Sequence, residues 1–248
     1  MTTTTLITRL RELKLGGMAR ALQTQLEQPG TYDGLAFSER LDLLLDQELL
    51  SRDQRKQHRL ITQARFKLNA TLHEIDYQNS RQLKRAQVAQ LATCDWIHKG
   101  QNLLITGPCG SGKTYLACAL GQTACLRDYS VRYYRLSRLF VEMTQAKAEG
   151  SYPRLLQQLA KTRLLILDDW GLETLEPAAR HDLMEIMDDR YDHSSTLIIS
   201  QLPTDQWYAT IGDNTLADAI LDRLMHNAHR INLKGESMRK KRATLDPS

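Results

Sequence analysis

A glycine-rich stretch at residues 107–114, GPCGSGKT, ends in a lysine and a threonine. It matches the pattern G-x-x-x-x-G-K-S/T, follows an apolar run at 103–105 and precedes a stretch of helical composition. Glycines let a backbone wrap closely enough to point its N–H groups at phosphate oxygens, and the following helix adds positive charge at its N-terminus. We expect Lys113 to reach the β and γ phosphates of a nucleotide, and the Thr114 hydroxyl to ligate Mg²⁺. The alternative is a glycine-rich turn without a ligand, which the flanking strand and helix disfavour.

Two adjacent carboxylates, Asp168 and Asp169, follow the apolar run LLIL at 164–167. A buried strand that ends in carboxylates could place Asp168 in the ligand shell of Mg²⁺, while Asp169 could orient or deprotonate an attacking water. The alternative for this segment alone is a strand that enters a solvated loop. A two-metal nuclease site is disfavoured because no further acidic cluster stands at supporting positions. Together with the glycine-rich stretch, the pair predicts binding and hydrolysis of ATP.

Hydrolysis also requires a polar group that positions water and a cation that balances charge on the γ-phosphate. Gln201, directly after an apolar run at 196–200, is a candidate for the first task. Arg223, in a helical stretch at 217–227, and Arg239, near the C-terminus, are candidates for the second. By spacing alone, each could equally be a surface or capping residue.

Short apolar runs alternate with helical stretches beyond residue 70, as in a parallel sheet with crossover helices. Each run is nearly continuous in apolar character, which is typical of strands covered on both faces. The runs lie at 102–106, 131–136, 164–167, 196–200 and 230–233. The expected fold class is therefore α/β.

The first part of the chain lacks such runs and is rich in Leu, Gln, Glu and Arg. Leucines recur at near-helical spacing, a break follows at 29–34, and Ser38 could cap a second helix. We therefore expect an N-terminal helical domain at 1–67, which binds a partner, and a nucleotide-binding domain at 68–248. Residues 51–85 hold nine basic residues against three acidic ones, so DNA contact and an exposed helical face are both open for this stretch.

Composition indicates an ordinary folded protein, with 25% charged and 42% hydrophobic residues and a net charge of +4. The four cysteines form no Cys-x-x-Cys pair, so neither a zinc site nor a disulfide framework is suggested. No signal-like leader or membrane-length apolar run is present in the sequence. A cytoplasmic protein is expected.

Five segments in order, GPCGSGKT, LLILDDWG, LIISQLP, ADAILDRLMHNAHRI and LKGESMRK, resemble the IstB-like branch of AAA+ ATPases, close kin of the DnaC helicase loaders. The N-terminal stretch through QARFK resembles that family too. The resemblance implies a P-loop fold with a five-stranded parallel sheet flanked by helices, a small N-terminal all-helical domain and no full C-terminal lid domain. It also implies a bacterial transposition helper that binds ATP and Mg²⁺, oligomerises on duplex DNA and activates the transposase of an insertion sequence.

The resemblance assigns roles residue by residue. Asp169 stands where most AAA+ proteins carry a catalytic Glu, and Gln201 corresponds to a sensor that is more often Asn in loaders. Arg223 matches the arginine finger, which completes the site of a neighbouring subunit, and Arg239 matches the second sensor, although the chain ends at Ser248 without room for the usual lid. Lys113 belongs to the catalytic set, and Thr114 and Asp168 are the metal ligands. The expected nucleotide-binding residues are Gly107, Pro108, Cys109, Gly110, Ser111, Gly112, Lys113, Thr114 and Tyr115.

The stretch 136–161 is longer than a minimal crossover, and an extra helix at this place lines the DNA-binding face in related initiators and loaders. Basic side chains there would bind phosphates without reading sequence. The candidates are Arg135, Arg138, Lys147 and Arg154, with Lys161 nearby. A solvated crossover helix with scattered charge is the alternative.

Two other functions remain open for the whole chain. A replicative helicase loader would share the ATPase half and differ in what the N-terminal module binds. A passive adaptor would use ATP as an assembly switch and scarcely hydrolyse it.

Overall fold

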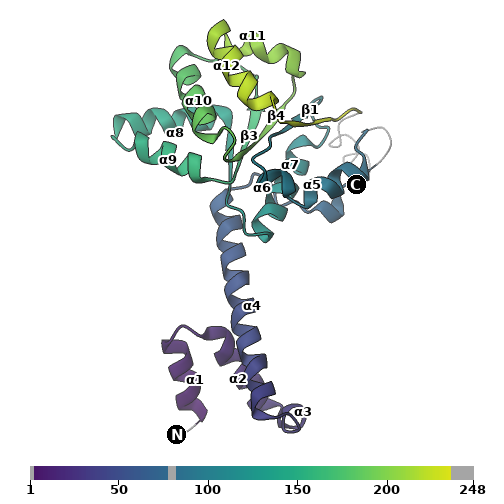
Figure 1. Ribbon diagram of the computed structural model, residues 1–248, viewed down its shortest axis with the longest axis vertical. Helices are drawn as coiled ribbons and strands as arrows, with labels where there is room; N and C mark the ends of the chain where they lie inside the picture. The colour runs from purple at the N-terminus through teal and green to yellow at the C-terminus, as the bar shows by residue number, and fades with distance from the viewer. Residues whose placement is uncertain (1–2, 78–81, 236–248) are drawn as a thin grey trace, which may run out of the picture. The chain divides into compact units, whose positions relative to one another are not determined.

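The computed structural model describes residues 3–77 and 82–235 of the 248. The chain divides into two compact units, Met1–Arg59 and Leu60–Ser248 (Figure 1). The division falls inside the long helix α4 (Phe37–Ala64), earlier than the boundary at residue 67 expected from the sequence. The difference arises because Leu60, Ile61 and Ala64 pack into the core of the second unit.

The first unit is helical, as expected. It consists of α1 (Thr3–Glu12), α2 (Gly16–Glu27), α3 (Pro29–Tyr32) and the greater part of α4. Gly17 of α2 lies directly against the backbone of α4, where an added Cβ would be 2.6 Å from the Cα of Glu48. A side chain at residue 17 would therefore force α2 away from α4.

A buried carboxylate joins α2 to α4. Glu48 Oε2 accepts hydrogen bonds from the backbone N–H groups of Gly17 (2.7 Å) and Met18 (3.3 Å), and its Oε1 accepts one from Arg52 Nε at 2.8 Å. Burial opposes the ionisation of Glu48, but the hydrogen bonds from Arg52 and the two N–H groups outweigh it and lower the pKa of Glu48. This stabilisation is present above the ordinary pKa of a glutamate and is lost as the pH falls through the lowered value.

The predicted cap at Ser38 is wrong. Helix α4 begins at Phe37, and the Ala36 carbonyl accepts its first backbone hydrogen bond, from Arg40 N–H at 3.1 Å. The carboxylate of Glu39 accepts the Ala36 N–H at 2.7 Å, which is one half of a capping box. Ser38 therefore lies inside the first turn.

Among its described residues, the second unit contains one parallel sheet, with strands in the order β2-β3-β4-β1-β5. The strands are β1 (Leu103–Thr106), β2 (Val131–Arg135), β3 (Leu164–Trp170), β4 (Ser195–Ser200) and β5 (His229–Asn232). The helices are η1 (Leu72–Glu74), α5 (Arg85–Ala92), α6 (Asp95–His98), α7 (Lys113–Leu126), α8 (Leu136–Ala148), α9 (Tyr152–Lys161), α10 (Pro177–Arg190), η3 (Thr204–Gln206), α11 (Trp207–Ile211) and α12 (Asn214–Met225).

Helices cover both faces of this sheet (Figure 1). Successive strand residues point to opposite faces, so Leu103 and Ile105 of β1 join the core under α5, α6 and α7, while Leu104 joins the core under α8 to α12. The expected α/β class, the five parallel strands and the flanking helices are confirmed.

The third strand differs from its expected bounds. The apolar run ends at Leu167, but β3 continues to Trp170, and its pairing with β4 is irregular between these two residues. Asp168 and Asp169 therefore lie within the strand rather than after it. Pairing extends this far because Trp170 is 1% exposed and packs against Trp207, with ring centroids 5.3 Å apart.

Within residues 3–77 and 82–235, no helix is both long enough and apolar enough to cross a membrane.

Candidate functional site

The glycine-rich loop connects the end of β1 to the start of α7, at the carboxyl edge of the sheet (Figure 1). Gly107 has φ +145°, and a Cβ there would collide with the carbonyl oxygen of Leu233, just beyond β5. Gly112 directly precedes α7. Its φ of +89° lies in the left-handed region, which glycine adopts without steric strain. The loop thus begins and ends at backbone positions that favour glycine, and α7 begins at Lys113.

Lys113 is folded into this loop. Its side chain is buried, and Nζ donates hydrogen bonds to the carbonyl oxygens of Gly107 (2.7 Å) and Pro108 (2.8 Å). Burial lowers the pKa of the Lys113 ammonium. The ammonium group is therefore held inside the curve of the loop, where it can bind an anion.

Asp168 lies beside Thr114, and the role of both residues as metal ligands stays a prediction. The Thr114 hydroxyl donates to Asp168 Oδ2 at 3.0 Å, and the backbone N–H of Asp169 donates to Asp168 Oδ1 at 2.8 Å. Asp168 is 2% exposed, so its carboxylate is oriented by protein contacts rather than by solvent. A hydroxyl and a carboxylate oxygen at this separation form a donor set of the kind that Mg²⁺ prefers.

Two further side chains approach the same carboxylate oxygen, and sequence reasoning missed both roles. The buried Tyr133 of β2 donates its phenolic hydrogen to Asp168 Oδ2 at 2.5 Å, and Lys67 Nζ lies 3.9 Å from that atom. Burial and the neighbouring carboxylate raise the pKa of the Tyr133 phenol, which keeps it a donor. In the sequence, Tyr133 is one residue of an apolar run and Lys67 is one of several charges in a basic stretch. Neither residue could therefore be linked to this site from the sequence.

Asp169 turns away from its neighbour. Its backbone has φ +64°, its side chain is 31% exposed, and its Oδ2 lies 3.6 Å from Arg135 Nε at the end of β2. The left-handed conformation is uncommon for a residue other than glycine and costs on the order of 1 kcal/mol or more. It directs the Asp168 carboxylate toward Thr114 and the Asp169 carboxylate toward solvent at the edge of the sheet.

Gln201 and Arg223 lie at opposite ends of the sheet. Gln201 is exposed and directly follows β4, the strand between β1 and β3, so it stands between the loop and the aspartates. Arg223 lies in α12 near the amino end of β1, because Asn102, just before that strand, donates to the Arg223 carbonyl at 3.0 Å. Its guanidinium pairs with Asp188 at 2.6 Å. Arg223 therefore does not reach the glycine-rich loop of its own chain.

A family model for IstB-like ATP binding proteins matches residues 8–245. The chain belongs to this family. It is 48% identical to y4pL of Sinorhizobium fredii, over 94% of both chains, and 50% identical to a protein of IS1162 from Pseudomonas fluorescens, over 80% of this chain and 86% of that one. Both relatives are named as insertion sequence ATP-binding proteins.

The fold of this IstB-like protein resembles that of the DnaC helicase loader. The two structures match with a TM-score of 0.55 at 22% identity, over 67% of this chain and 97% of DnaC. At this identity the match shows a shared fold, which agrees with the expected five-stranded sheet and flanking helices.

Tyr115 of the IstB-like chain binds the segment before α5. Its hydroxyl donates to Glu74 Oε2 at 2.6 Å and accepts the backbone N–H of Thr71 at 3.3 Å. These hydrogen bonds connect the first turn of α7 to this segment. Contact of Tyr115 with a nucleotide stays a prediction. Arg239 lies outside the described residues.

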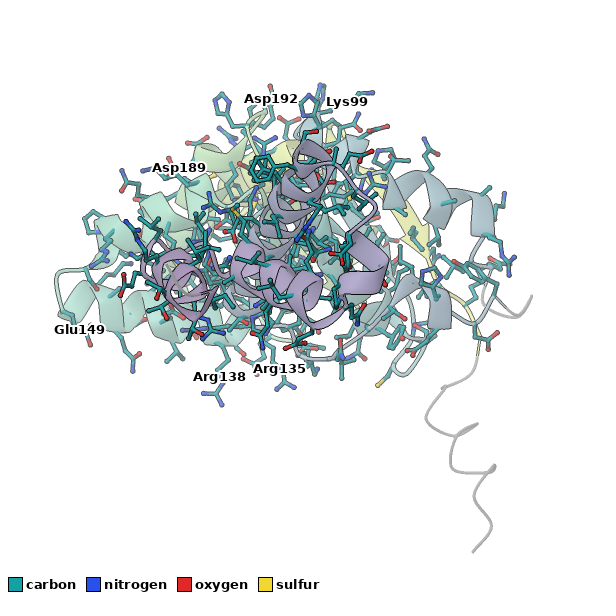
Figure 2. All side chains as sticks on the ribbon, turned by 90° about the horizontal axis from the view of Figure 1, so that it is seen from below. Lys99, Arg135, Arg138, Glu149, Asp189 and Asp192 are labelled. Carbon is teal, nitrogen blue, oxygen red and sulfur yellow. The ribbon has the colours of Figure 1, made fainter. Side chains whose placement is uncertain are left out.

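The four basic residues expected to bind DNA differ in their surroundings. Arg135 and Arg138 extend from the same edge of the unit, away from the ribbon (Figure 2), although Arg135 approaches Asp169. Lys147 Nζ lies 2.5 Å from Asp182 Oδ1, so its charge is already paired. Arg154 lies instead on a pocket of about 370 Å³ at the amino edge of the sheet, whose lining contains no carboxylate.

Proposed function

We propose that this chain binds and hydrolyses ATP with Mg²⁺, assembles with further copies of itself on duplex DNA, and assists the transposase of an insertion sequence. The observation that carries the proposal is the 3.0 Å contact between Thr114 and Asp168 beside the buried Lys113. It places the glycine-rich loop beside a buried carboxylate at one edge of the sheet, which supports binding of phosphate and of a metal at adjacent positions. The family match and the insertion-sequence relatives support the role in transposition.

The residues at this edge of the sheet would have separate roles in hydrolysis. The loop N–H groups and Lys113 would bind the phosphates, while Thr114 and Asp168 would hold the metal. A bound Mg²⁺ supplies positive charge that offsets the charge on the phosphate oxygens. Asp169, exposed at the edge of the sheet, would orient water or accept its proton, and Gln201 would position the same water from β4.

Asp169→Asn tests the hydrolytic part of the proposal. We expect steady-state ATP turnover to fall about 100-fold or more, since a general base contributes this much, while the affinity for ATP stays as in the wild type. Glu173→Gln, at an exposed carboxylate in the following loop, is the matched control and should leave turnover unchanged. A turnover that Asp169→Asn does not alter would reject the assigned role.

A protein that uses ATP only as an assembly switch is the second candidate. The contact between Asp169 Oδ2 and Arg135 Nε favours it, because a cation lies 3.6 Å from one oxygen of the proposed base. Turnover of the wild-type protein with and without duplex DNA distinguishes the two. Assembly with ATP in the absence of any turnover would establish the switch.

The DNA-binding part rests on exposed positive charge in α8 and α9. Arg138 is exposed, and the pocket beside Arg154 also holds Arg132 and Lys161. Such charges bind phosphates without reading bases, so affinity falls steeply with salt.

Replacing both Arg138 and Arg154 by Gln is expected to weaken binding to duplexes of any sequence. Each lost phosphate contact reduces the slope of log affinity against log salt by about one, so the double variant should lose about two. Fluorescence anisotropy of a labelled duplex measures the slope. The control is Lys99→Gln, at an exposed lysine shortly before β1 (Figure 2). An equal change of slope in the control and in the double variant would contradict the assignment.

A further inference from the structure

Lys67 lies beside the proposed metal ligand Asp168, and its backbone is anchored on both sides. Phe66 packs so closely against α7 that a Cβ on Gly121 would be 2.6 Å from Phe66 Cε1. On the other side, Gln122 donates to Asn69 Oδ1 at 2.7 Å. The main chain at residue 67 is thus fixed to α7, while the four-carbon side chain of lysine can change conformation.

The ammonium group of Lys67 lies close to the carboxylate of Asp168, the proposed metal ligand. Nζ lies 3.9 Å from Asp168 Oδ2, the same oxygen that accepts the Thr114 and Tyr133 hydroxyls. The Lys67 side chain is 29% exposed and the Asp168 side chain 2%. A partly exposed cation therefore lies beside a carboxylate that is otherwise buried and offsets its charge.

We propose that Lys67 is a positioning residue that balances Asp168 in the metal-free protein and gives up this place when Mg²⁺ and ATP bind. The inference rests on the proposed binding of ATP with Mg²⁺ by this chain. A divalent cation bound to Oδ2 repels an ammonium at the same oxygen, so the metal and Lys67 compete for this position. Tyr133 and Thr114 are neutral and can stay. Lys67 therefore raises the Mg²⁺ concentration that nucleotide binding requires, compared with a site that has the same metal ligands and no lysine.

Lys67→Met tests the competition, because methionine keeps much of the side-chain length without the charge. Binding of a non-hydrolysable ATP analogue is measured at increasing Mg²⁺ concentration. We expect the half-saturating Mg²⁺ concentration to fall about 3- to 5-fold, the effect of one partly exposed ion pair. Lys67→Arg retains the charge and should restore the wild-type dependence, whereas an unchanged Mg²⁺ dependence in Lys67→Met would reject the proposal.

A second measurement uses the unaltered protein and follows the side chain itself. Acetylation of lysines is quantified by mass spectrometry without ligand, with the analogue alone, and with the analogue plus Mg²⁺. Lys67 should become more reactive only when both are present, Lys113 should become protected, and the exposed Lys99 should not change. Protection of Lys67 under these conditions would mean that it binds phosphate and would overturn the proposal.

The two failures are distinguishable. Wild-type protein that binds no analogue at any Mg²⁺ concentration rejects the proposed function itself. Wild-type protein that binds the analogue, with Lys67 showing neither the change in Mg²⁺ dependence nor the rise in reactivity, rejects only the role of Lys67.

Discussion

Replacing Lys113 by alanine is expected to reduce ATP affinity by about 100-fold or more, since loss of a buried charged partner of an anion costs roughly 2–5 kcal/mol. Lys113 is 7% exposed and its ammonium lies within the curve of the glycine-rich loop. Calorimetric titration with ATP and Mg²⁺ measures the change. Assembly on DNA and hydrolysis should be lost together with binding.

Cys109→Ala is the matched control for this prediction. Cys109 is in the same loop, but its side chain is exposed, and only its backbone is expected to face the phosphates. Its replacement should leave ATP affinity as in the wild type. Unaltered affinity in Lys113→Ala, with a circular dichroism spectrum like that of the wild type, would show that the nucleotide is bound elsewhere.

Replacing Arg223 by alanine is expected to separate ATP binding from hydrolysis and assembly. The guanidinium lies at the amino edge of the sheet, whereas the glycine-rich loop lies at the carboxyl edge, so it can act only on a nucleotide of another subunit. ATP affinity of the isolated subunit should stay unchanged, while turnover should fall about 1,000-fold, the usual contribution of an arginine finger. The wild type with ATP is expected to form ordered assemblies on duplex DNA in electron micrographs, and Arg223→Ala is expected to form none.

Mixing two inactive variants tests the shared site directly. Asp169→Asn supplies an intact Arg223, and Arg223→Ala supplies an intact Asp169, so some sites in a mixed assembly contain both. Turnover should recover partly on mixing. Arg230→Ala, at an exposed arginine of β5, should behave as the wild type. No recovery, together with an unaltered rate in Arg223→Ala alone, would exclude a role across the subunit boundary.

The elements around the site could be predicted because their signals are local. The runs that became β1 and β4 are apolar on consecutive residues, which two covered faces require, and the glycine-rich loop contains its phosphate-binding groups within eight residues. The Asp pair was recognisable for a similar reason, because Asp168 and Asp169 directly follow an apolar run of four residues.

Other features of the site could not be predicted, because they depend on contacts between distant residues. Tyr133 reaches Asp168 only because β2 pairs with β3, and Lys67 only because its neighbours pack on α7. Lys147 counted as a free charge in the sequence, but folding places Asp182 of α10 beside it. The predicted end of β3, at Leu167, was wrong because it too depends on a distant contact. Trp170 packs against Trp207, and the strand continues to Trp170 beyond the apolar run.

The most direct test of the nucleotide site is a calorimetric titration of the wild-type protein with ATP, performed with Mg²⁺ and again with a chelator. Binding of one ATP per chain that is stronger with Mg²⁺ is the predicted result, because Lys113 and the loop bind the phosphates while Thr114 and Asp168 bind the metal. Absence of binding at millimolar ATP, or equal binding with and without Mg²⁺, would contradict it.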